Sequence, residues 1–242
     1  MNRTRLTQMF IAGMVLAAIA STAYASLGSH ALHASYALAL LALAAATSRM
    51  KIKLPGIDGN MSVNLPFLLM AVVNLSALEA VAIASVSTVV QCWPTLEGKF
   101  KPGQMLFNVS MMAFATSMAN LIWNAGWLGK GAWASESLML ASATAAFFLG
   151  QTAPVAGIIK VAEGAAMRRI WLGIVQLSFP YYILSAGMTS MVNLASHHFG
   201  WQAALLVFPM MYAVYRSYRL YFGRATEGLH TSPMARSASV GA

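Results

Sequence analysis

The sequence predicts an all-α fold: a polytopic transmembrane helical bundle of about eight spans, with a short central hairpin over residues 62–93. Of its 242 residues, 59% are hydrophobic and 9% are charged, whereas about 25% of the residues of a soluble domain are charged. The apolar residues form continuous runs of helical length, unlike the alternating segments of a membrane β-barrel. Basic residues gather in the short connections between these runs. Together these observations predict a multi-pass membrane protein.

The apolar runs predict one helix each. They cover residues 7–26, 31–48, 62–75, 77–93, 104–124, 135–159, 169–194 and 201–221. The first run, with Arg3 and Arg5 before it and Ala23-Tyr24-Ala25 after it, also has the pattern of a cleavable secretory signal. Its length favours an uncleaved anchor, and cleavage would leave the orientation of the other spans unchanged.

The positive charges predict the orientation of the spans. All of the 15 basic residues except Lys130 fall before the first run, at or beyond the end of the last run, or in or next to alternate connections. By the positive-inside rule these segments are cytoplasmic, so both termini are expected in the cytoplasm of a bacterium with the chain in its inner membrane. The net charge of +9 therefore indicates topology and not a nucleic-acid partner; the lipid bilayer is the expected surrounding.

The same rule predicts the central hairpin. Merging residues 62–93 into one span would move Lys99 and Lys101 to the outside and reverse every later connection. Two short helices keep the basic connections on one side of the membrane. The first of them, residues 62–75, would rise only about 21 Å, whereas the bilayer core is about 30 Å thick. We therefore expect the hairpin to stop short of the outer surface or to be extended by neighbouring residues.

The composition predicts two regions. Residues 1–222 form the transmembrane helical domain, and residues 223–242 are polar, rich in small residues and without periodicity. Such a segment is expected to be a disordered cytoplasmic tail.

The acidic residues give no indication of an enzyme. Of six acids, only Glu79 is placed to lie within the membrane, and Ser76 three residues before it forms the capping-box pattern S-x-x-E. The spacings include no pair of carboxylates suited to acid–base catalysis, no H-E-x-x-H and no nucleotide-binding loop. We expect no catalytic activity and no cofactor.

Polar amides within the spans have two interpretations. Asparagine and glutamine side chains commonly join helices by hydrogen bonds in membranes. Alternatively, four polar groups that the predicted map places in the outer half of the membrane line an outward pocket for a small polar or amphipathic ligand, and these are Asn74, Glu79, Asn120 and Asn124.

Four histidines are expected at the outer side of the membrane. Imidazole is the commonest metal ligand, so one hypothesis is a zinc, copper or nickel site formed by the first and last outer connections. The other is that these are loop histidines that bind no ligand. The residues are His30, His33, His197 and His198.

The last span is expected to leave the membrane through an aromatic and basic segment. Tyrosines recur every three residues there, with arginines between them, as in an interfacial anchor. The segment that would carry an output signal contains Tyr215, Arg216, Tyr218 and Arg219.

Several strings resemble the membrane-integral (MASE-like) sensor domains of bacterial cyclic-di-GMP signalling proteins. They are KIKLPGIDGNMSVN at 51–64, QCW at 91–93, KPGQMLFN at 101–108 and YRSYRLYFGR at 215–224. In that family the span bundle precedes a cytoplasmic HD-GYP phosphodiesterase or GGDEF cyclase. Because no such domain follows Arg224, the resemblance implies an orphan sensory module that acts through a cytoplasmic partner, or a remnant of a longer signalling protein.

A second resemblance gives the alternative function. Short paired helices with a polar turn are similar to the substrate-binding subunits of energy-coupling-factor transporters, which take up a small solute from outside. Interrupted helices near a polar joint are a general feature of binding sites in membranes.

Overall fold

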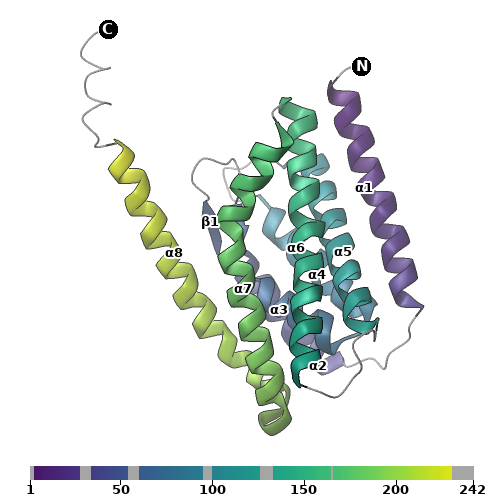
Figure 1. Ribbon diagram of the computed structural model, residues 1–242, viewed down its shortest axis with the longest axis vertical. Helices are drawn as coiled ribbons and strands as arrows, with labels where there is room; N and C mark the ends of the chain where they lie inside the picture. Colours follow the sequence, from purple (N-terminus) through teal and green to yellow (C-terminus); the bar gives the residue numbers. More distant parts are fainter. Residues whose placement is uncertain are drawn as a thin grey trace.

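The fold is a helical bundle, seen in a computed structural model that describes residues 3–27, 34–53, 60–94, 100–125, 133–164 and 166–230 (Figure 1). Its elements in chain order are α1 (Arg3–Ser26), α2 (Ala34–Ser48), β1 (Lys51–Lys53), β2 (Asn60–Ser62), α3 (Leu65–Asn74), α4 (Ala77–Cys92), α5 (Pro102–Asn124), α6 (Trp133–Glu163), α7 (Met167–Phe199), the 3-10 helix η1 (Gly200–Leu206) and α8 (Val207–His230).

Helices long and apolar enough to cross a membrane confirm the predicted class. Within the described residues these are α1, α5, α6 and α7, while α2, α3 and α4 are apolar but shorter. Large apolar side chains are exposed around the bundle, for example Leu16, Ile183 and Met191. Exposed apolar surface of this extent marks a surface that contacts lipid or another protein. The chain is therefore an all-α protein with the properties of a membrane protein.

The helices separate the charges between two ends of the bundle. Arg3 donates a hydrogen bond to the Glu163 carbonyl, which places the start of α1 beside the end of α6. There Gly164 ends α6 with φ of +77°, a conformation that glycine adopts without strain. We call this the basic end, since it also carries Arg5, Lys160 and Arg169, at the adjoining ends of α1, α6 and α7. The opposite end, where α6 begins and α7 finishes, is at the bottom of Figure 1.

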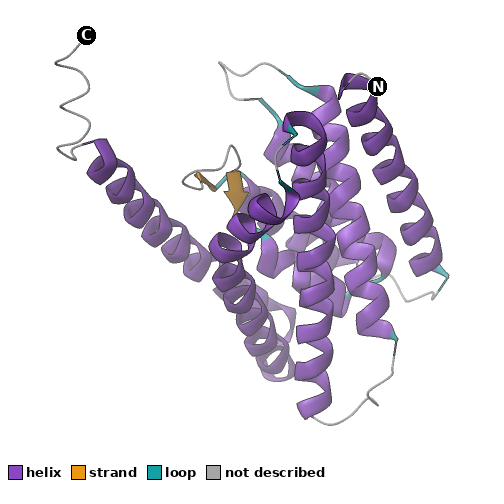
Figure 2. Ribbon diagram, turned by 45° about the horizontal axis from the view of Figure 1, so that its top comes forward, coloured by secondary structure: helices purple, strands orange, loops and turns teal. Residues whose placement is uncertain are grey.

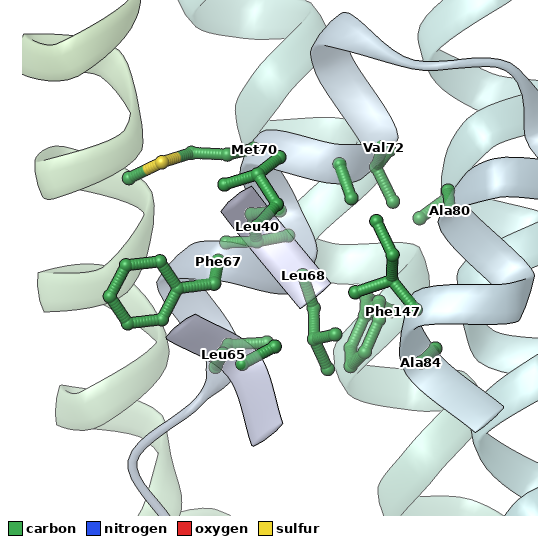
Figure 3. Close-up of a cluster of buried hydrophobic side chains, with 14 of the residues drawn as sticks. Leu40, Leu65, Phe67, Leu68, Met70, Val72, Ala80, Ala84 and Phe147 are labelled. Atoms are coloured by element: carbon green, nitrogen blue, oxygen red, sulfur yellow. The ribbon is translucent and has the colours of Figure 1, made fainter. Parts of the chain in front are cut away.

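The short helix α3 is the centre of the core. Every residue from Leu65 to Val72 is buried, and Phe67 is 0% exposed. It packs against α2, α4, α5 and α7. Figure 3 shows its side chains in one cluster with Leu40 of α2, Ala80 and Ala84 of α4, and Phe147 of α6. A helix that is apolar on all sides is stable only when neighbouring elements surround it. The predicted hairpin helix is thus the most enclosed element described.

α5 connects the remaining helices. It packs along α1, α4 and α6. At the α5–α6 contact, a Cβ added to Gly150 would lie 3.0 Å from the Ala115 Cα. A side chain at position 150 would therefore require the two helices to move apart by a few tenths of an ångström.

α8 leaves the bundle at an angle (Figures 1 and 2). It contacts η1, α2 and β1 through Val207 and Met211, which are buried, and Val214, Tyr215 and Tyr218, which are half-buried. Its opposite face is exposed.

Three details differ from the sequence prediction. β1 and β2 form a two-stranded antiparallel ladder, with Ile52 opposite Met61, just before α3; three-residue strands are too short for a periodicity signal. The last span begins with η1 and not with an α-helix. α8 continues to His230, past the predicted boundary at 222, because Arg224, Ala225 and Glu227 are good helix formers. Residues 231–242 lie outside the described residues.

Candidate functional site

Polar groups of α7 hold the first turn of α3. The backbone N–H of Leu65 donates to the Tyr181 hydroxyl at 3.1 Å. The Thr189 hydroxyl lies 3.3 Å from the Pro66 carbonyl oxygen and 2.9 Å from that of Ser185. The first N–H groups of a helix have no partner within the helix. Tyr181 therefore satisfies a buried group that would otherwise destabilise the core.

An amide of α5 holds the other end of α3. The Asn120 side chain is 3% exposed and donates to the Val72 carbonyl at 3.1 Å. Asn124 in turn donates to the backbone and side-chain oxygens of Asn120. Asn120 thus joins two helices, as the hydrogen-bonding interpretation of the amides predicts, and Asn124 orients its side chain.

Asn74 and Glu79 make local contacts. Asn74 donates to the Met70 carbonyl of its own helix. The Glu79 carboxylate accepts from the N–H and the hydroxyl of Ser76, and the Ser76 hydroxyl accepts from the Glu79 N–H. This is the predicted capping box at the start of α4.

A cavity opens between α3, α5, α6 and α7 at the end of the bundle opposite the basic end, which we call the cavity end. Its volume is about 220 Å³. The lining residues are Val73, Trp123, Glu136, Ser137, Leu140, Thr189, Ser190, Met191, Asn193 and Leu194. The four residues predicted to line a pocket are not in this set, although Val73 and Trp123 directly precede Asn74 and Asn124. Asn120 and Asn74 belong instead to the hydrogen bonds behind it.

The lining combines one carboxylate with neutral polar and apolar groups. Glu136 and Ser137 are exposed at the first turn of α6, and Leu140 is buried one turn further along. Ser190 and Asn193 come from α7, and Trp123 provides an aromatic ring. These groups are suited to binding a small molecule, because a few polar groups among apolar ones orient a ligand.

Sequence reasoning missed Glu136 and Trp123 as site residues. Each has an ordinary local explanation: a glutamate favours the first turn of a helix, and a tryptophan favours the membrane interface. Both are at helix ends flanking the connection between α5 and α6, and this common location is the signal that the sequence contains.

The predicted exit segment is divided between two surfaces of α8. Tyr215 and Tyr218 are half-buried against the core, whereas Arg216 and Arg219 are exposed. Tyr181 lies within the central core, and Tyr218 packs against the same core. The segment therefore packs against the core that contains the residue binding the start of α3.

The metal hypothesis rests mainly on residues that the structure does not describe. His30 and His33 lie outside the described residues, as does the His197 side chain, and His198 is exposed. Among the described residues, no group of three or more metal-binding side chains could hold an ion. The four-histidine site stays a prediction.

Comparison with known proteins adds no relative. No family model, curated protein or solved structure matches this chain.

Proposed function

We propose that this chain is a sensory module of a bacterial inner membrane, with eight spans and both termini in the cytoplasm. The distribution of charge supports the orientation: the lysines and arginines of α1, α6 and α7, and Lys101 directly before α5, are at the basic end. A membrane retains such segments on its cytoplasmic side. The cavity then opens to the outside.

The observation that carries a sensory role is that α7 lines the cavity, bonds to α3 and belongs to the core against which α8 packs. Thr189 lines the cavity and also contacts the Pro66 carbonyl. On the same face of α7, Tyr181 binds the first residue of α3, and it belongs to the core against which Tyr215 and Tyr218 of α8 pack. A ligand that displaces α7 would change both contacts. If the ligand binds more tightly to one of two positions of α7, it would shift the equilibrium between the corresponding positions of α8.

The signal would pass to a cytoplasmic partner through the exposed face of α8 around Arg216 and Arg219. The resemblance to cyclic-di-GMP sensor domains supports this direction of transfer. We propose no catalytic activity for the chain itself.

Purification of the full-length chain from its native membranes tests the sensory role. A cytoplasmic protein is expected to co-purify with the complete chain and to be lost on deletion of residues 215–242. Deletion of residues 231–242 alone is the matched control, and it is expected to retain the partner. A complete chain that retains no cytoplasmic protein would contradict signalling.

The cavity also favours a second function, that of a solute-binding subunit of a transporter. A transport subunit needs an outward binding site and no exit helix coupled to it. Uptake of a labelled solute that depends on this chain and is unaffected by deletion of residues 215–242 would favour transport over signalling.

A further inference from the structure

The charge around the cavity indicates the class of its ligand. Glu136 provides a carboxylate, and the described lining residues include no lysine, arginine or histidine. Among the residues whose side chains are described, His198 is the basic residue nearest in sequence to the lining residues. It follows Leu194 in α7 and is exposed. A carboxylate that is exposed at a cavity and has no basic partner among the described residues attracts a cation.

Two helix termini add to this negative charge. Val73 precedes the last residue of α3, and Trp123 precedes the last residue of α5. The carboxyl end of a helix carries roughly half a negative charge. The only amino-terminal turn in the lining is that of α6, and it carries Glu136 itself. The backbone and the side chains therefore favour the same sign of ligand charge.

The remaining lining residues distinguish an organic cation from a metal ion. A metal ion would require several oxygen, nitrogen or sulfur ligands around one point, and the described residues contain no such group of His, Cys, Asp or Glu. Trp123 provides an indole ring, which attracts an ammonium group through its π face. Val73, Leu140 and Leu194 provide apolar surface for a hydrocarbon body.

The volume limits the ligand to a small molecule. About 220 Å³ is below the roughly 300–1,000 Å³ of sites for drug-sized ligands. Asn193 and the hydroxyls of Ser137 and Ser190 offer hydrogen bonds to a polar substituent.

We infer that the cavity between α3, α5, α6 and α7 binds a small organic ammonium ion. Its positive group pairs with the Glu136 carboxylate and the Trp123 ring, and its apolar part contacts Leu140 and Val73. This inference rests on the proposed function and deepens it by naming the class of ligand that the outer side would supply.

Calorimetric titration of the full-length chain in nanodiscs tests the inference. The probes are choline, tetramethylammonium and butylammonium, compared with 3,3-dimethylbutan-1-ol, the uncharged isostere of choline, and with butyrate. At least one ammonium ion is expected to bind saturably, and the alcohol and butyrate at least about tenfold more weakly, because they lack the charge-assisted contact.

Variants assign the binding to the lining residues. Glu136→Gln is expected to weaken ammonium binding at least about tenfold, and Trp123→Leu about two- to thirtyfold. Glu163→Gln, at the exposed basic end, and Trp93→Leu, at the exposed end of α4, are the matched controls and are expected to bind as the original chain does. Equal thermal unfolding of Glu136→Gln and the original chain excludes misfolding.

Three results would overturn the inference: no saturable binding of any ammonium probe, equal binding of choline and its uncharged isostere, or unchanged affinity in Glu136→Gln. Saturable butyrate binding with an affinity that Glu136→Gln does not change would overturn the ligand class. It would leave a sensory or transport role in place. Ammonium binding by a chain that recruits no partner and supports no uptake would contradict the proposed function instead, and would leave the ligand class in place.

Discussion

Two glutamates at the cavity end have different neighbours and therefore different roles. Glu79 is held by the Ser76 N–H and hydroxyl in the capping box of α4. Glu136 is exposed in the lining of the cavity. A carboxylate that caps a helix contributes to stability, whereas one at a cavity is available to a ligand.

Glu79→Ala is expected to lower the free energy of unfolding by about 1 kcal/mol, because α4 loses its reciprocal cap. Ammonium binding is expected to be unchanged. Thermal unfolding in detergent and the titration described above measure the two effects. The opposite pattern, stable protein with weakened binding, would assign Glu79 to the ligand site.

Asn120→Leu is expected to lower the free energy of unfolding by about 1–2 kcal/mol, since the Val72 carbonyl loses its buried donor and Asn124 loses an acceptor. Asn74→Leu is the matched control, because the bond that Asn74 makes among the described residues is within its own helix; it is expected to change stability by less than about 0.6 kcal/mol. Equilibrium unfolding in mixed micelles compares them. Equal losses of stability in the two variants would show that the hydrogen bond between α5 and α3 contributes no more to the free energy of unfolding than a bond within one helix.

At the scale of elements, the sequence predicts the helices well and their packing poorly. The eight apolar runs correspond to helices because each is continuous and ends at polar residues. The apolar run of α3 does not reveal that Tyr181, Thr189 and Asn120 surround it, since these contacts join residues far apart in the sequence. The cavity was missed for the same reason: its lining comes from four helices.

The α5–α6 contact gives a prediction for these two elements. Gly150→Ala is expected to lower the free energy of unfolding by about 1–3 kcal/mol, because the new Cβ would lie 3.0 Å from the Ala115 Cα. Gly187→Ala, with nothing within 4 Å of the added Cβ, is the matched control and is expected to stabilise its helix by up to about 1 kcal/mol. Thermal unfolding distinguishes them, and a neutral Gly150→Ala would contradict the close packing.

For the whole molecule, the separation of charge unites the fold with the proposed function. The lysines and arginines of α1, α6 and α7 are at the basic end, and the cavity with Glu136 is at the other. If the basic end faces the cytoplasm, α3 and α4 enter the membrane and return, and the cavity opens outward. The start of α8 is then at the outer side and the helix runs toward the inner side, with Arg216 and Arg219 near its middle.

The most direct test is the side of the membrane on which residue 99 lies. In a Cys92→Ala background, Lys99→Cys and Ser137→Cys provide single thiols for a membrane-impermeant maleimide applied to intact spheroplasts. Ser137→Cys is expected to be labelled at once, and Lys99→Cys only after the membrane is permeabilised. Labelling of Lys99→Cys in intact spheroplasts would place the connection after α4 outside and contradict the hairpin, the outward cavity and the cytoplasmic termini.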